Sequence, residues 1–250
     1  MADRVEGYHR LVIWSVNRRR GATAALSGHG PHADWRFTSL SRSVPSFEEK
    51  LMQARQRVFS AAGIAMTATF VGVIAAMGAV PAFAVPGSSV PITIQSMGVM
   101  LAGSILGRWR GAAAVTIFLL LVALGLPLLS GGRGGLGVFF TPSVGFLIGF
   151  PVAAFVIGWL SERLSAPRSL PRMIAVNILG GIVILHAFGV IGVALVTQVS
   201  LAAAIVASLV YLPGDLVKAV LAAVIARGVH QALPGLLPDR HEREPAAAAA

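Results

Sequence analysis

Residues 213–229 read PGDLVKAVLAAVIARGV, an apolar run that holds an acid, Asp215, and a base, Lys218, three positions apart. An apolar run of about 17–25 residues is long enough to cross a bilayer as a helix. A charged side chain at the bilayer centre costs about 2.5–3.5 kcal/mol on insertion scales, so ionisable residues inside such a run default to a functional interpretation. The segment therefore predicts a membrane-spanning helix with a candidate site near its start.

The composition of the whole chain also indicates a membrane protein. Of its 250 residues, 56% are hydrophobic and 12% are charged, and the mean hydropathy is +0.78. Soluble domains carry about 25% charged residues. The other apolar runs of spanning length are residues 58–80, 90–106, 111–127, 143–161 and 173–195. A further run at 199–211 is too short to cross, and we expect it to be a partial or interfacial segment.

These runs predict an all-α, polytopic membrane protein with a bundle of six transmembrane helices in a membrane domain at residues 55–235. Residues 1–54 form a basic tail without periodicity, which we expect to be mostly disordered and cytoplasmic. Met52 is an alternative start, so residues 1–51 can be an extension. Residues 236–250 are expected to be a C-terminal tail.

The basic residues are distributed very unevenly. The chain has 20 Lys and Arg against 10 Asp and Glu, and with six spans all but Arg133 and Lys218 fall on the side of the two termini. Because cytoplasmic loops carry the excess of Lys and Arg, both termini are predicted to be cytoplasmic, in a multi-pass protein of the bacterial cell membrane. A cleavable signal ending at Ala82-Phe83-Ala84 is a weaker alternative, since the apolar run before it is longer than a signal core.

Several classes of function are disfavoured. The chain has no cysteine, which excludes disulfides, thiolate metal sites and a catalytic thiol. Its basic tail has few aromatic stacking partners, so nucleic-acid binding is not expected. It has no H-E-x-x-H and no G-x-S-x-G, and Asp215 is the only acid within a span, so we expect no enzyme and no cofactor. It has no P-loop either, and any ATP-hydrolysing motor must be a separate chain.

Two segments predicted to face outward differ from ordinary connectors. Residues 85–95 read VPGSSVPITIQ, and residues 129–142 read LSGGRGGLGVFFTP with five glycines and one charge. Glycine lets backbone turn sharply and approach a ligand closely, and non-helical backbone at membrane depth needs cover from protein. We predict Gly-rich, re-entrant-like loops that form a lid. Two flexible surface loops are the alternative.

The outward level also holds Asp215 and Lys218. Asp215 would lie at the start of the last helix, with Lys218 one turn later on the same face. A structural N-cap with a snorkelling lysine would explain the aspartate alone. It explains Lys218 poorly, because this is one of only two lysines in the chain and lies well inside a span. A ligand site is the interpretation we favour.

Over roughly residues 55–235 the chain resembles the BioY family, the biotin-capturing subunits (S components) of energy-coupling-factor (ECF) vitamin transporters. The resemblance rests on an ordered set of segments: VPITIQ at 90–95, LGRWRG at 106–111, GLP at 125–127, the glycines of 131–137, GFLIGF at 145–150 and LPGDLVK at 212–218. It departs from the family at 141–143, where TPS replaces Gly-Pro-Thr or Gly-Pro-Ser. Phe118 and His186 stand where many members carry tyrosine.

The resemblance implies biotin as the transported ligand. Biotin offers a cyclic urea, an apolar ring and a carboxylate, so its site needs an acceptor, a donor, apolar walls and a cation. Asp215 can accept from the urea N–H, Lys218 can donate to the urea oxygen, and Arg133 can bind the carboxylate. The remaining candidates are the polar side chains Gln95 and Thr93 and the walls Phe118, Phe139 and Phe140.

The family also implies partners: a transmembrane coupling subunit and two ATPase subunits, in contact with membrane lipids. The first span carries a stripe of small residues, Ala61, Ala65, Ala68 and Gly72, which we expect to dock the coupling subunit. Packing inside the chain's own bundle is the alternative. Arg108 and Arg110 can contact the partner or lipid headgroups. The rival function is an ion-coupled secondary transporter of a small polar solute in which Asp215 carries a proton.

Overall fold

A computed structural model describes residues 61–84, 89–234 and 236–237 of the chain. The described helices belong to one compact unit, Pro45–Ala250. The predicted N-terminal tail, the first residues of the first predicted span and most of the predicted C-terminal tail lie outside these residues.

The described residues are helical, which confirms the predicted all-α class. They contain no β-strand, only isolated antiparallel bridges between Phe83 and Ile92 and between Leu129 and Arg133. The elements are α3 (Ala61–Gly78), α4 (Gln95–Leu106), α5 (Arg108–Ala123), the 3-10 helix η1 (Leu136–Phe140), α6 (Val144–Arg163), the 3-10 helix η2 (Ala166–Arg168), α7 (Leu170–Ile178), the π-helix η3 (Leu179–Ile184), α8 (Leu185–Thr197), α9 (Leu201–Ser208), the 3-10 helix η4 (Leu209–Tyr211) and α10 (Leu212–Ala232).

Four helical columns in the described residues are long and apolar enough to cross a membrane. They are α3, α6, the continuous column Leu170–Thr197 and the continuous column Leu201–Ala232. Two further helices are shorter, since α4 has 12 residues and α5 has 16. The chain is therefore a multi-pass membrane protein.

The last column corrects the boundary predicted from sequence. The run at 199–211 is not a separate interfacial segment, because α9 continues through η4 into α10 over 32 residues. Pro213, in the first turn of α10, has no backbone N–H to donate to a helical hydrogen bond. The tighter 3-10 turn Leu209–Tyr211 comes just before it and carries the helix past the proline.

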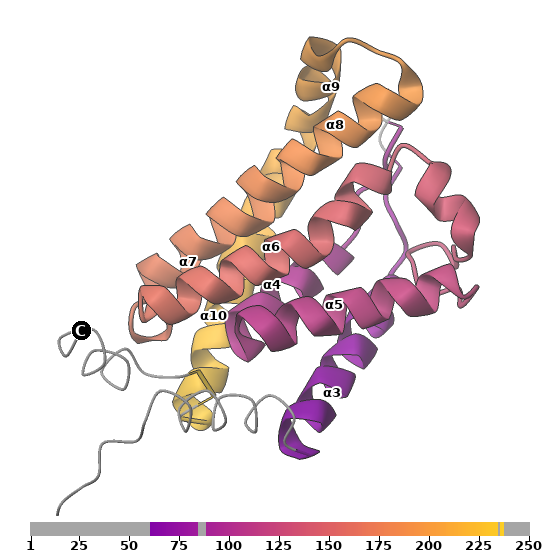
Figure 1. The fold of residues 1–250 in the computed structure, drawn as a ribbon. Helices are drawn as coiled ribbons and strands as arrows, with labels where there is room; N and C mark the ends of the chain where they lie inside the picture. Colours follow the sequence, from indigo (N-terminus) through magenta and orange to yellow (C-terminus); the bar gives the residue numbers. More distant parts are fainter. Residues whose placement is uncertain (1–60, 85–88, 235, 238–250) are drawn as a thin grey trace, which may run out of the picture. The chain divides into compact units, whose positions relative to one another are not determined.

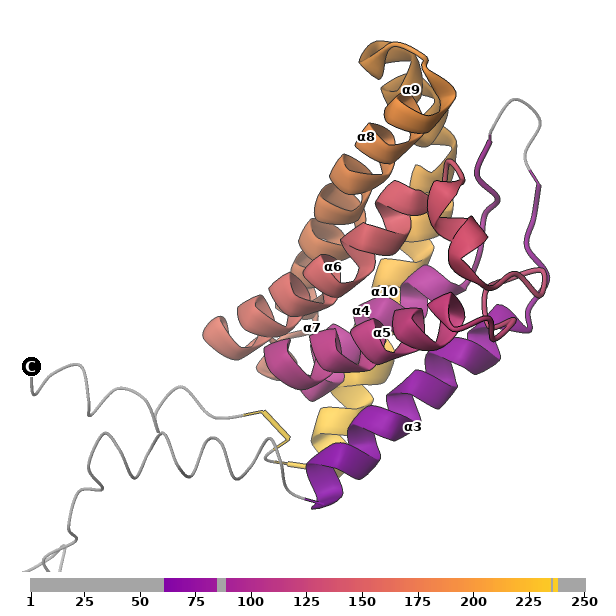
Figure 2. The same cartoon turned by 45° about the vertical axis from the view of Figure 1, so that its right-hand side comes forward.

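Helix α4 lies at the centre of the bundle. It packs against α3, α5, α6 and α10, and Figures 1 and 2 show it enclosed by these helices. All twelve of its residues, Gln95 to Leu106, are buried. A helix that is apolar around its whole circumference is stable only when neighbours cover every face. Its short length suits a helix that contacts protein rather than lipid.

The column Leu170–Thr197 changes helical geometry in its middle. Its six-residue π-turn, η3, separates α7, which packs mainly against α10, from α8, which packs against α6 and α9. Two glycines in this turn leave room for side chains of neighbouring helices: Gly180 faces Ile157, and Gly181 faces Met100. π-turns inside α-helices are frequent at functional sites.

One side chain at the start of α4 connects this helix to α3 and to the 128–130 segment. The Gln95 amide nitrogen donates to the carbonyl oxygens of Ile74 (3.3 Å) and Leu128 (2.9 Å). Its oxygen accepts from the backbone N–H (3.0 Å) and the hydroxyl (3.2 Å) of Ser130. Gln95 is 2% exposed, so these four bonds satisfy a buried amide and connect α3, α4 and the 128–130 segment.

We predict that Gln95→Leu destabilises the protein by about 1–3 kcal/mol, because two carbonyl oxygens and the buried N–H of Ser130 lose a hydrogen-bond partner. Thermal unfolding of the detergent-solubilised chain measures the change. The control is Thr116→Ala, since the exposed Thr116 hydroxyl bonds only to Ala112 within its own helix. Equal melting temperatures for the Gln95 variant and the wild type would contradict this structural role.

Candidate functional site

A cavity opens where the helix ends meet residues 89–95 and 129–142, which belong to the two segments predicted to face outward and are called the outward segments below. It measures about 620 Å³ when its open mouth is included. Its polar lining comes from α4, α10 and both outward segments, and its apolar lining from α6, α8 and the same segments. The lining residues are Val90, Pro91, Ile92, Thr93, Gln95, Ser96, Leu129, Arg133, Ser143, Phe146, Leu147, Phe150, Leu185, Tyr211, Asp215 and Lys218. Binding sites for small molecules combine apolar walls with a few polar groups in the same way.

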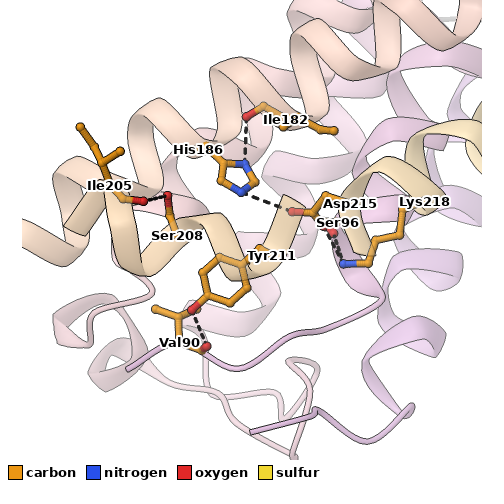
Figure 3. Close-up of polar contacts among 9 residues, drawn as sticks. All are labelled: Val90, Ser96, Ile182, His186, Ile205, Ser208, Tyr211, Asp215 and Lys218. Atoms are coloured by element: carbon orange, nitrogen blue, oxygen red, sulfur yellow. Dashed lines mark hydrogen bonds and ion pairs between the residues drawn. The ribbon is translucent and has the colours of Figure 1, made fainter. Parts of the chain in front are cut away.

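The structure places the predicted acid and base in this cavity as a buried ion pair. Lys218 Nζ lies 2.7 Å from Asp215 Oδ1, and the two side chains are 14% and 8% exposed. The ammonium also donates to the Ser96 hydroxyl of α4, at 3.3 Å (Figure 3). The other carboxylate oxygen, Oδ2, lies 3.5 Å from Nε2 of His186 in α8. Side chains from three helices thus meet at the Asp215–Lys218 pair.

These contacts contradict the alternative interpretation of Asp215 as a helix cap. The start of α10 at Tyr211 has helical backbone angles and no side-chain cap hydrogen bond. Because α9, η4 and α10 are continuous, the N–H groups near Asp215 are not those of a free helix end. The carboxylate contacts side chains instead, and its interior position needs another explanation.

An aromatic cluster lies beside the ion pair. The rings of Phe146, His186 and Tyr211 pack against one another with centroids 5.9–6.3 Å apart. The Tyr211 hydroxyl donates to the Val90 carbonyl oxygen at 2.7 Å and so connects η4 to the first outward segment (Figure 3). His186, Tyr211, Phe146 and Ser96 were not among the candidates from sequence. The only available signal was the family departure at His186.

Two other candidates also lie in the cavity. Thr93 lines it, and Arg133 lines it from the second outward segment. Arg133 Nε donates to the Ser130 carbonyl oxygen at 3.2 Å, which fixes the base of the guanidinium group. The other guanidinium N–H groups have no partner among the described residues. Gln95 reaches the cavity as well, but the four bonds described above occupy its amide.

The phenylalanines predicted as walls lie elsewhere. Phe118 is fully buried in the core of α5 and does not line the cavity, because an apolar ring on the inward face of this helix packs between neighbouring helices. Phe139 packs against the core and Phe140 is 80% exposed, and neither lines the cavity. Aromatic walls come from Phe146, Phe150 and Tyr211 instead.

The predicted docking stripe lies on an open face. Ala61, Ala65, Ala68 and Gly72 are all exposed on α3. A Cβ added to Gly72 would meet nothing within 4 Å. Within the described residues, the stripe is therefore not used for packing in the chain's own bundle. The described residues also contain no group of three or more His, Cys, Asp or Glu placed to hold a metal ion.

Comparison with known proteins gives one consistent answer. The profile of the BioY family matches residues 50–235. The biotin transporter BioY of Rhizobium etli is 47% identical over 182 residues, which is 71% of this chain and 97% of the relative. The biotin transporter BioY of Rhodobacter capsulatus is 47% identical over 189 residues, with the same two coverages.

A solved structure agrees with the sequence matches. It is the S-component for biotin from an ECF-type ABC transporter, with a TM-score of 0.64 and 30% identity. The match covers 75% of this chain and 95% of that one. These relatives are transporters, and none is named as an enzyme. With a family match over most of its length and close relatives covered almost entirely, the chain belongs to the BioY family.

Proposed function

We propose that this chain captures biotin outside the cell and delivers it inward as the substrate-binding subunit (S component) of an ATP-driven ECF-type transporter. The observation that carries the proposal is the buried Asp215–Lys218 pair in an apolar-walled cavity, in a chain of the BioY family. Relatives are named biotin transporters, and the similar solved structure is an S-component for biotin.

The cavity offers the groups that biotin requires. Asp215 accepts a hydrogen bond from a urea N–H, and Lys218 donates to the urea oxygen while it neutralises Asp215. Phe146, Phe150 and Leu185 supply apolar surface for the thioether ring and the alkyl chain.

The other end of the ligand needs a cation. Arg133 lines the cavity from the outward segment, and its remaining N–H groups can pair with the biotin carboxylate. Thr93 adds a hydroxyl. Gln95 holds the segments in place, and its occupied amide leaves little capacity for the ligand.

The arrangement in the membrane follows the distribution of charge. We place six crossings through the membrane: α3, α4, α5, α6, the column Leu170–Thr197 and the column Leu201–Ala232. Both termini are then cytoplasmic, by the positive-inside rule. The cavity opens outward, and the Gly-rich segment that carries Arg133 forms part of its lid.

Energy has to come from partners, because the chain contains no P-loop. The exposed stripe Ala61, Ala65, Ala68 and Gly72 is suited to close contact with a helix of a transmembrane coupling subunit. Lipid tails contact the remaining exposed apolar faces. ATP hydrolysis by two further subunits then drives release of biotin into the cytoplasm.

The ion pair is tested by Asp215→Asn and Lys218→Ala. Each substitution is expected to weaken biotin binding at least tenfold, or about 1.4 kcal/mol. Asp215→Asn leaves the Lys218 ammonium unpaired, and Lys218→Ala removes a donor to the ligand and leaves the Asp215 carboxylate unpaired. Equilibrium binding of labelled biotin to the purified chain, in competition with other vitamins, measures the effect. Wild-type affinity in both variants would refute the site.

Arg133 is tested by comparing two ligands. Arg133→Ala should weaken binding of biotin about tenfold and of uncharged biotin amide much less, because only biotin presents a carboxylate to the guanidinium. Isothermal titration with both ligands gives the two ratios. Arg172→Ala is the control, since Arg172 is exposed and its guanidinium bonds to the Leu164 carbonyl oxygen away from the cavity. Equal losses for both ligands would contradict the assignment.

The docking stripe is tested by Ala65→Leu and Gly72→Leu. A larger side chain should keep the partner helix at a distance and abolish ATP-dependent uptake, while biotin binding to the isolated chain stays within about twofold of wild type. Uptake into vesicles containing the full complex is the measurement. Ala202→Leu, at an exposed position of α9, is the matched control.

Two outcomes would argue against this assembly. Full uptake in both stripe variants would contradict the docking face. Uptake that persists without any ATPase subunit would favour an ion-coupled secondary transporter instead.

A further inference from the structure

His186 has one ring nitrogen in a defined hydrogen bond and one without a partner. Its Nδ1 lies 2.9 Å from the Ile182 carbonyl oxygen in the π-turn of the same column (Figure 3). A carbonyl oxygen can only accept, so Nδ1 carries a proton. The other nitrogen, Nε2, is buried and has no hydrogen-bond partner among the described residues.

That second nitrogen faces the carboxylate of the proposed site. Nε2 lies 3.5 Å from Asp215 Oδ2, which is within ion-pair distance but longer than a normal N–H···O bond. If the ring is neutral, the Nε2 lone pair points at an anionic oxygen, and both groups are acceptors. If Nε2 takes up a proton, the ring becomes a cation that donates to Asp215, and the contact becomes attractive.

Few ionisable side chains among the described residues surround the His186 ring and can influence whether it is protonated. The ionisable side chains that face His186 from the last column are Asp215, Lys218 and Tyr211, and Arg133 lines the same cavity from the outward segment. Helix α6 contributes only the uncharged ring of Phe146 here, and α9 contains no ionisable residue. Asp215 is the only acid near the ring within the described residues.

We propose that His186 is a positioning residue for biotin: in its protonated form it fixes Asp215 Oδ2, while Lys218 fixes Oδ1, and this form binds biotin more tightly than the neutral one. The inference rests on the proposed function and extends it to pH. His186 does not line the cavity, so it acts through Asp215.

Two physical effects give the direction. A carboxylate held at both oxygens is ordered before the ligand arrives, which lowers the cost of binding, and each oxygen keeps a second lone pair for a urea N–H. The protonated ring also adds a positive charge beside the cavity, which favours a ligand that carries a carboxylate. Loss of the proton reverses both effects. Biotin affinity therefore falls when rising pH removes the second proton from His186.

The test is the dissociation constant of labelled biotin between about pH 5.5 and 8, where the ligand carboxylate stays ionised. We expect the wild-type affinity to fall about fivefold or more across this range. His186→Phe keeps an aromatic ring beside Phe146 and Tyr211 but cannot donate, so it should bind weakly at every pH with a flat profile. His186→Gln keeps an uncharged N–H donor, so it should bind within about threefold of the acidic wild type, also with a flat profile.

His230 provides the matched control. It lies at the opposite end of α10, where its Nε2 is 2.9 Å from the Ser104 carbonyl oxygen. His230→Gln should keep the wild-type pH dependence. A flat wild-type profile, or a slope that survives in His186→Phe, would overturn the role of His186. A wild-type chain that binds no biotin at any pH would instead contradict the proposed function itself.

A measurement on the unmodified protein covers the case in which a variant fails to fold. In ¹⁵N-histidine NMR spectra, His186 should carry a proton on Nδ1 throughout the range and a second proton on Nε2 at its acidic end. Addition of biotin should increase the fraction of His186 that carries the second proton. A neutral ring protonated on Nε2 alone, or a transition that biotin leaves unchanged, would overturn the inference.

Discussion

The site depends on an ion pair that is expensive to bury. Removing a carboxylate and an ammonium from water costs several kcal/mol for each ion, and their attraction compensates only when geometry is good and other polar groups help. Here the Asp215–Lys218 contact is 2.7 Å long, Ser96 accepts from the ammonium, and His186 faces the second carboxylate oxygen. The fold must therefore place α4, α8 and α10 side by side around the Asp215–Lys218 pair. The close packing of the bundle is a condition of the chemistry.

The central helix α4 contributes both to the packing of the bundle and to the site. Its buried surface packs on four other helices, and its first residue, Gln95, bonds to Ile74 of α3 and to Leu128 and Ser130 of the 128–130 segment. The next residue, Ser96, contacts Lys218. One short helix thus carries a structural amide and a site hydroxyl at successive positions. The segment held by Gln95 and the hydroxyl that contacts Lys218 are consequently attached to the same rigid helix.

The sequence predicted the fold class and the central pair well, because both depend on local composition. Apolar runs of membrane length mark helices directly, and a charge inside such a run is conspicuous. The boundary between the runs at 199–211 and 213–229 was wrong because it was judged on the length of each run, whereas α9 continues through a 3-10 turn into α10. Run length alone does not reveal that two neighbouring runs form one helix.

Other parts of the site could not be predicted because they depend on which helix faces meet. Phe118 and Phe146 are the same residue type in apolar helices, yet one is buried in the core and the other lines the cavity. His186 comes into contact with Asp215 across 29 positions of sequence, and no local pattern marks that meeting. Tyr211 could not be predicted for the same reason, because its hydroxyl donates to the backbone carbonyl oxygen of Val90, which is distant in the sequence.

The π-turn Leu179–Ile184 has a consequence for comparing this chain with its relatives. A π-turn holds about one residue more than the α-helical turn it replaces, and each residue turns a helix by about 100°. A relative that lacks one amino acid here would have an α-helical turn in place of the π-turn, and its later side chains would keep facing the same neighbouring helices. Pairwise alignments that place the gap a few positions away would then equate His186 with a lipid-facing neighbour. The column is best aligned in two halves, each anchored on its own packing partners.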